Sequence, residues 1–324
     1  MKFRAFLHSL FVSIVIGAGL VQMAYSPSAQ AMTVRQQTSH QALLENAKPL
    51  LWEVRHPEHP KQLLYVFGTI HLMPKEMKWR TGPVHKAVTN STRYVFEIDT
   101  AAIKEQVATQ QALFRHGIYH DPNDSLQKAL GDDDYSKVLA VAKKFKLNEA
   151  QLQRMRPWLA SVTIGREFVI KHNMDPKYGV ENILTRIAEM RDISVSGLET
   201  PDEQIGQFGK IPDNVQKVML MEALDQMEAG LKYVEKISEA WARGDHQLFH
   251  KEHLEQILSQ KNGPLFVKLL IVDRNKLWIP RIESYFRKPG ISFVAVGTMH
   301  VIGEDGVPEL LKRKGYKVKL IQGR

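Results

Sequence analysis

Residues 63–71, LLYVFGTIH, and residues 291–300, ISFVAVGTMH, repeat one arrangement at distant points of the chain. In each segment an apolar run leads into Gly-Thr, one further apolar residue and a histidine, His71 or His300. Apolar runs of this length, rich in β-branched and aromatic residues, are typical of buried strands. A strand that ends at glycine and is followed by histidine places an imidazole at the mouth of a sheet. We therefore expect His71 and His300 to share one functional site, the alternative being two unrelated structural turns.

Other segments with strand or helix patterns surround the two motifs. The expected strands, besides the two above, are residues 51–55, 93–98, 193–198 and 316–321. The expected helices next to them are residues 83–90, 178–190 and 307–314. Strands that are joined through helices favour parallel pairing. The expected fold class is therefore α/β: a mixed, largely parallel sheet built from both chain ends, with helical layers and a helical middle insertion.

The first residues have the pattern of a secretory signal. Lys2 and Arg4 precede an apolar run over residues 6–23, and Ala29-Gln30-Ala31 offers small residues at the cleavage positions. We expect residues 1–31 to be cleaved, residues 32–48 to form a polar arm and residues 49–324 to form a single α/β domain. The alternative for the apolar run is a membrane anchor. The expected protein is exported, periplasmic or secreted, with no stable membrane span after signal cleavage.

Composition excludes several classes of chemistry. The chain has 324 residues and no cysteine, which rules out thiolate nucleophiles and cysteine metal sites. The formal net charge is +9, but the basic residues are spread along the chain without interleaved aromatics. Nucleic acid is therefore not an expected partner. Sequence motifs of zinc-protease helices, serine-hydrolase elbows, P-loops and dinucleotide-binding loops are absent from the sequence.

Four side chains with metal-binding or acid–base capacity follow expected strands. They are His71, Glu97, Glu199 and His300. In parallel sheets, functional groups collect at the carboxyl ends of strands. Two imidazoles and two carboxylates suit zinc, manganese or cobalt, with a water activated at an open position and one carboxylate as general base. The alternatives are that the histidines cap turns and that the glutamates are acids at helix N-termini.

Arg274 adds a fifth candidate. It lies four residues after Leu270 and four before Trp278, on the apolar stripe of an expected helix over residues 264–286. A guanidinium buried on such a stripe is costly without a partner. We expect Arg274 to pair with a carboxylate ligand or to hold a negative charge of the substrate, the alternative being a solvated side chain.

Taken together in their order, the motifs resemble those of the TraB/GumN family, over roughly residues 50–321. The segments that carry the resemblance are the two GTxH motifs, Phe96-Glu97, Tyr178-Gly179-Val180-Glu181, Gly197-Leu198-Glu199-Thr200, Asp273-Arg274-Asn275 and residues 296–318. This family is related to the Tiki metalloproteases and, more distantly, to erythromycin-esterase-like and ChaN-like proteins. Glu181 stands where we expect Asp, a difference that we expect to leave the site unaffected.

The resemblance implies a metal-dependent peptidase. By analogy with Tiki, His71, His300 and Glu97 would bind a divalent transition metal, Mn, Co or Zn, while Glu97, Glu199 and Arg274 would serve catalysis. The expected function is thus a metal-dependent hydrolase acting on a peptide or a small molecule. The alternatives are an esterase-type hydrolase and a non-catalytic protein that binds a peptide, haem or a small ligand.

Overall fold

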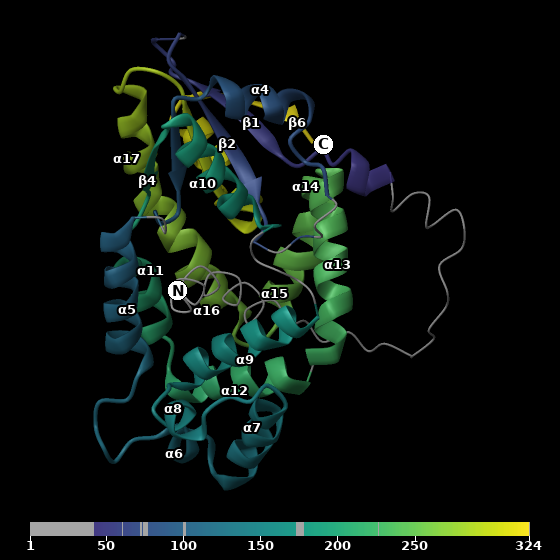
Figure 1. Cartoon of the computed structure of the whole chain (residues 1–324). Helices are drawn as coiled ribbons and strands as arrows, with labels where there is room; N and C mark the ends of the chain where they lie inside the picture. Colours follow the sequence, from purple (N-terminus) through teal and green to yellow (C-terminus); the bar gives the residue numbers. More distant parts are fainter. Residues whose placement is uncertain are drawn as a thin grey trace. The chain divides into compact units, whose positions relative to one another are not determined.

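The computed structural model describes residues 42–59, 61–71, 73, 77–99, 102–172, 178–225 and 227–323, without the side chains of residues 228–235 and 252. Contacts divide the chain into two compact units. The sheet unit comprises the described residues among 21–99, 177–198 and 234–324, and the helical unit those among 100–176 and 199–233. Figure 1 shows the helices and strands of both units, coloured along the sequence.

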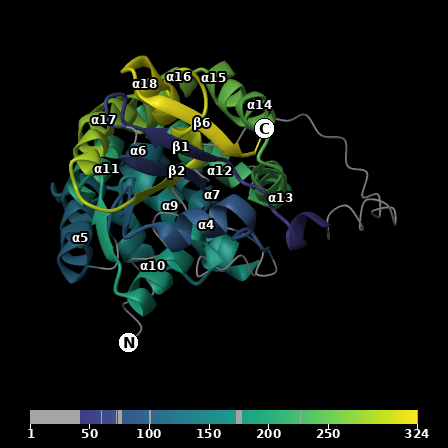
Figure 2. The same ribbon diagram turned by 90° about the horizontal axis from the view of Figure 1, so that it is seen from above.

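The sheet unit is built on six strands in the order β4-β3-β5-β2-β1-β6. They are β1 (Leu51–Arg55), β2 (Leu63–Thr69), β3 (Arg93–Phe96), β4 (Ser194–Gly197), β5 (Ser292–Gly297) and β6 (Lys317–Gln322). The pairs β4–β3, β3–β5 and β5–β2 are parallel, whereas β1 pairs antiparallel with β2 and β6. Figure 2 shows β2, β1 and β6 side by side at this antiparallel edge. The expected mixed, largely parallel α/β sheet is confirmed, with strands from both ends of the chain.

Helices complete the sheet unit and make up the helical unit. Those of the sheet unit are α4 (Gly82–Asn90), α10 (Val180–Arg191), α14 (His246–Phe249), α15 (Glu255–Ser259), α16 (Gly263–Val267), α17 (Asp273–Phe286) and α18 (Val307–Arg313). Those of the helical unit are α5 (Ile103–Gly117), α6 (Leu126–Leu130), α7 (Asp132–Lys144), α8 (Glu149–Gln153), α9 (Pro157–Lys171), α11 (Pro201–Gly209) and α12 (Asp213–Asp225). Helix α13 (Met227–Arg243) begins in the helical unit and ends in the sheet unit.

The core of the sheet unit is centred on β2 and β5. Their apolar runs are buried almost without interruption, as expected for parallel strands covered on both faces. Phe67 stacks on Trp79 and meets Trp241 and Phe293, and the indole nitrogen of Trp241 donates to the carbonyl oxygen of Gly68 at 2.7 Å. Aromatic packing therefore holds the strand in place directly before the first GTxH histidine.

Residues at the start of the described chain also pack into this core. Leu44 and Ala47 are buried within it, although both belong to the expected N-terminal arm. The expected signal segment, residues 1–31, lies outside the described residues. Among the residues that the structure describes, no helix is long and apolar enough to cross a membrane.

The helical unit has a core of its own. Leu126, Val138, Leu152, Ile164 and Leu220 belong to one buried cluster. Local sequence signals account for the starts of its helices. The Ser125 hydroxyl caps α6, Pro157 opens α9, and Thr200 and Glu203 form a capping box at α11. This unit supplies the helical middle expected from the sequence.

Gly68 gives a test of how closely the first GTxH motif is packed. A Cβ at this position would lie 2.9 Å from Val301 Cγ2 and 3.1 Å from Thr298 Oγ1, both in or next to the second motif. We expect Gly68→Ala to lower the free energy of unfolding by about 1–3 kcal/mol, because the neighbours are buried and cannot yield. Urea denaturation measures this. Gly165→Ala is the control: among the described residues, no atom outside its own helix backbone and chain neighbours lies within 4 Å of its Cβ position, and alanine favours its helix. Equal stability of Gly68→Ala and wild type would contradict the close packing.

Candidate functional site

Three of the predicted site residues follow neighbouring parallel strands. Strand β5 lies between β3 and β2, with Val294 beside both Val95 and Val66. Glu97 follows β3 directly, His71 lies two residues after β2, and His300 ends the 3-10 turn η4 (Thr298–His300) after β5. The parallel register thus brings the carboxyl ends of these strands to one edge of the sheet. The shared location that we expected for the two histidines agrees with this topology.

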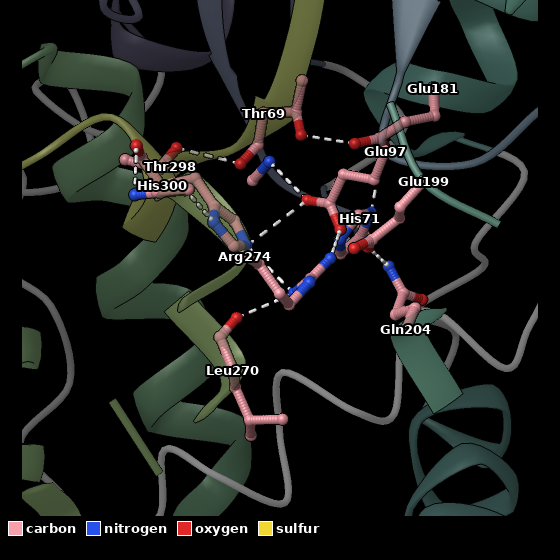
Figure 3. Close-up of polar contacts among 12 residues, drawn as sticks. Thr69, His71, Glu97, Glu181, Glu199, Gln204, Leu270, Arg274, Thr298 and His300 are labelled. Atoms are coloured by element: carbon pink, nitrogen blue, oxygen red, sulfur yellow. Dashed lines mark hydrogen bonds and ion pairs between the residues drawn. The ribbon is translucent and has the colours of Figure 1, made fainter. Parts of the chain in front are cut away.

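Arg274 lies at the centre of the group (Figure 3). Its Nη2 donates to Glu97 Oε2 at 2.6 Å, and its Nη1 donates to the Leu270 carbonyl oxygen at 2.8 Å and to His300 Nε2 at 3.1 Å. The side chain is only 7 % exposed and that of Glu97 12 % exposed. The expectation of a buried arginine paired with a carboxylate is confirmed.

A π-helical turn and a tryptophan position this arginine. The turn η3 (Lys268–Val272) interrupts the helix between α16 and α17 immediately before Asp273, and the carbonyl of Leu270 within it accepts from Arg274. π-Turns inside helices are frequent at functional sites. The guanidinium lies 4.8 Å from the ring centroid of Trp278, and this ring also contacts the His300 imidazole at 4.4 Å. Trp278 is therefore a common support for both side chains.

His300 is oriented by Asn275, which is completely buried. The Asn275 Nδ2 donates to the carbonyl oxygens of His300 at 3.2 Å and Asp305 at 2.8 Å. Because carbonyls only accept, these bonds place Oδ1 on the other side of the amide, where it lies 2.7 Å from His300 Nδ1. His300 thus carries its proton on Nδ1, and its Nε2 lone pair accepts from Arg274.

His71 is held by Glu181, from the first turn of α10. The Glu181 Oε2 lies 3.1 Å from His71 Nδ1, and its Oε1 accepts from the Thr69 hydroxyl. The Val180 amide donates to the Ile70 carbonyl oxygen at 3.3 Å, so this helix begins at the end of β2. Glu181 is therefore in direct contact with a predicted site residue, and the expectation that Glu in place of Asp leaves the site unaffected stays a prediction. Only the tertiary structure brings α10 to this strand end.

The two GTxH motifs also contact each other. The Thr298 hydroxyl donates to the Thr69 carbonyl oxygen at 2.9 Å, and the Gly297 amide donates to Glu97 Oε1 at 2.9 Å. A Cβ at residue 297 would lie 3.3 Å from Glu97 Oε1, which is a second reason for glycine at this position. Each oxygen of Glu97 therefore accepts a hydrogen bond, one from the backbone and one from Arg274.

The surroundings shift the pKa values of these side chains in different directions. Burial alone would raise the pKa of Glu97, but Arg274, both histidines and the Gly297 amide outweigh it and lower the pKa to about 2. Burial and the positive charge of Arg274 lower the pKa of His300 to about 3. Burial also lowers the pKa of His71, but the charge and hydrogen bond of Glu181, with Glu97, raise it to about 9. The two histidines consequently differ: His300 is neutral and His71 is protonated at neutral pH.

Glu199, the fourth strand-end candidate, belongs to the helical unit. Its carboxylate is buried and accepts from the Gln204 side-chain amide at 2.8 Å. It follows Leu198, the last residue of the sheet-unit segment that contains β4. Its role in catalysis therefore stays a prediction.

The imidazoles of His71 and His300 and the carboxylate of Glu97 are ligand types that a divalent transition metal accepts. Within the described part of the chain, no three or more histidine, aspartate or glutamate side chains lie in a group that could hold a metal ion as they stand. Each histidine nevertheless meets an oxygen through Nδ1, which is the usual surrounding of metal-binding imidazoles. Nε2 is then the ligand nitrogen, at His71 once the ring has lost its second proton. Arg274 donates to His300 Nε2, so the guanidinium must leave this nitrogen before a metal ion can bind it.

The fold and site define an α/β protein with two histidines and a glutamate at the carboxyl ends of adjacent parallel strands. Residues 50–320 match the model of the TraB/PrgY/gumN family, and the chain belongs to this family. It is similar to YbaP of Escherichia coli K12, described as an uncharacterized protein, with 18% identity over 248 residues, 76% of this chain and 87% of that protein. YbaP of Shigella flexneri matches with the same values. No solved structure matches the chain. The family indicated by the motifs is thus confirmed.

The Arg274–Glu97 pair gives a test of what stabilises the site. We expect Arg274→Met to lower the free energy of unfolding by about 3–5 kcal/mol, because it leaves a buried carboxylate without its main partner. The double variant Arg274→Met/Glu97→Gln should be less destabilised than the single one, since no buried charge is then uncompensated. Denaturation curves of the variants measure both effects. The control is Lys276→Met, an exposed position on the same helix. Additive losses in the double variant would contradict the pairing.

The pKa shifts predict the pH dependence of stability in the metal-free protein. His300 binds a proton in the unfolded chain near pH 6.5 but in the folded protein only near pH 3, so the free energy of unfolding falls as the pH is lowered through this range. The pKa of Glu97 is also lower in the folded protein, so a further loss of stability follows between pH 4.5 and about 2. His71 has its pKa raised, so its contribution is complete below 6.5 and is lost as the pH rises through 9. Urea denaturation at pH values from below 3 to above 9 measures these losses. His71→Gln should remove the alkaline loss, whereas the control His85→Gln, an exposed position, should keep it.

Proposed function

We propose that this protein is an exported, metal-dependent hydrolase, and that its substrate is a peptide. The observation that carries the proposal is the matched setting of the two GTxH histidines. Each imidazole meets an oxygen through Nδ1, and Glu97 follows the strand next to His300's strand. This arrangement supplies two imidazole nitrogens and one carboxylate from neighbouring strand ends, a donor set that zinc, manganese and cobalt accept.

His71 and His300 would hold the metal ion through Nε2, and Glu97 through its carboxylate. A divalent ion at this place supplies Lewis acidity and activates water for attack on an amide near neutral pH. Glu181 and Asn275 keep the imidazoles oriented. Glu97 would act as metal ligand or as general base, Arg274 would stabilise the negative charge that develops on the substrate, and Glu199 is kept as the candidate second carboxylate.

The peptide substrate and the compartment have separate support. The ordered motifs resemble those of the TraB/GumN family, which is related to the Tiki metalloproteases, and this analogy supports an amide rather than another bond as the target. Residues 1–31 have the pattern of a cleaved secretory signal, and this supports the periplasm or the exterior as the place of action. The sequence has no cysteine, so no thiol in this protein would be exposed to oxidation there.

An esterase-type hydrolase without a metal is the second candidate. The contact that favours it is the bond from Arg274 to His300 Nε2, which joins Glu97, Arg274 and His300 into one network without an added ion. In this arrangement Arg274 would hold the substrate's developing charge, and the His71–Glu181 pair would transfer protons. Both candidates assign Arg274 the same role toward the substrate, but only the first candidate depends on a metal ion.

The metal content of the purified protein distinguishes the metal-dependent hydrolase from the esterase-type hydrolase without a metal. We expect protein purified without chelating resin to contain about one equivalent of a transition metal, measured by mass spectrometry, because a catalytic site of this kind holds a single ion. His71→Gln and His300→Gln should each lose it, and His85→Gln, the exposed control, should retain it.

Activity assays complete the test. Loaded wild-type protein should cleave a peptide library, and a chelator should abolish the cleavage. Ester cleavage by metal-free protein would overturn the proposal in favour of the second candidate. Absence of metal after incubation with zinc, manganese and cobalt, together with a co-purifying ligand and no cleavage, would instead indicate a binding protein.

A further inference from the structure

Glu181 is the only acidic side chain in the first turn of α10, an ordinary place for a carboxylate that interacts favourably with a helix N-terminus. The contacts of its carboxylate, however, go beyond an interaction with the helix N-terminus. Both oxygens are directed to the end of β2, one to the Thr69 hydroxyl and the other to His71 Nδ1 at 3.1 Å. The side chain therefore joins the helix to the first GTxH histidine.

The partners of Glu181 leave little freedom in the orientation of its carboxylate. Thr69 is 1 % exposed and is the last residue of β2, so its hydroxyl has a fixed position. The bond from the Val180 amide to the Ile70 carbonyl oxygen holds the backbone of α10 against the same strand end. A carboxylate accepts hydrogen bonds and cannot donate them, so the Nδ1 that faces it carries the proton.

His300 has the same proton position with a different partner. Asn275 Oδ1 accepts from its Nδ1 at 2.7 Å, and two backbone carbonyls fix the orientation of this amide. The two motifs, although they lie on different strands, thus end in imidazoles with protonated Nδ1. One partner is a carboxylate from α10 and the other an amide from α17.

We propose that Glu181 is the positioning residue of His71: it holds the proton of the neutral imidazole on Nδ1 and leaves the Nε2 lone pair for a ligand. Asn275 holds the proton of His300 on Nδ1 in the same way. A carboxylate partner also makes an imidazole a better electron donor than an amide does, so His71 is the stronger ligand of the pair. The proton position is a property of the metal-free protein, whereas the effect on a bound metal rests on the proposed function.

Nitrogen NMR of the histidine rings in the metal-free protein tests the proton position. Spectra are recorded above the pKa of His71, about 9, and its signals are assigned with His71→Gln. Wild type should show a protonated Nδ1 and an unprotonated Nε2 at His71. Glu181→Gln should keep this pattern, because the amide oxygen still accepts, whereas Glu181→Ala should move the proton toward Nε2, the preferred form in water. The signals of His300 should stay unchanged in both variants.

Two threonine variants form a matched control. Thr69 donates to Glu181, whereas Thr298 donates to the Thr69 carbonyl oxygen, so both are buried hydroxyls of the GTxH motifs with different acceptors. Thr69→Val should broaden or shift the His71 nitrogen signals, and Thr298→Val should leave them in place. A merely structural role of Glu181 predicts no difference between Glu181→Gln and Glu181→Ala in the tautomer of His71. That result, or a proton on Nε2 in wild type, would overturn the proposal.

Titration with Zn²⁺ alone, followed by calorimetry, tests the consequence for a metal. We expect Glu181→Ala to weaken zinc binding by about 10–100-fold, and Glu181→Gln to weaken it less. If wild type binds no zinc while the His71 tautomer follows Glu181, the proposed function fails and the positioning role stands. If zinc binds equally to wild type and Glu181→Ala, the positioning role fails and the metal site stands.

Discussion

The bond between Arg274 and Glu97 is the interaction on which the rest of the site depends. A guanidinium and a carboxylate, each almost fully buried, are stable in the interior only when both are paired and their other polar atoms are satisfied. The structure meets this condition with the Leu270 carbonyl, the Gly297 amide and the face of Trp278. The π-turn before α17, the glycine of the second GTxH motif and the tryptophan all serve the same buried charge pair.

The two histidines are chemically unequal. Burial and the charge of Arg274 lower the pKa of His300 and keep it neutral, whereas the carboxylate of Glu181 outweighs burial and raises the pKa of His71. Near-identical sequence motifs therefore end in side chains with opposite pKa shifts. The cause lies in the helix that packs at the end of each strand. Helix α17 supplies Arg274 and Asn275 to His300, whereas α10 supplies Glu181 to His71.

Much of the fold could be predicted from local patterns. The apolar runs before Gly68 and Gly297 indicated the central strands, because buried strands have short-range composition signals. The burial of Arg274 could be predicted as well, from its place on an apolar stripe. The importance of Glu181 and Asn275 could not, since both look like ordinary polar residues of a helix and gain their role only from contacts distant in the chain.

The sequence by itself determined the family, the α/β class and the placement of His71, Glu97 and His300 after buried strands, because these depend on motif order and on periodicity within short segments. The tertiary structure decided which nitrogen of each histidine meets which oxygen, and that one arginine contacts both Glu97 and His300. The physical reason is the register of parallel strands. Residues distant along the chain become neighbours only when β3, β5 and β2 pair, and no spacing in the sequence encodes that distance.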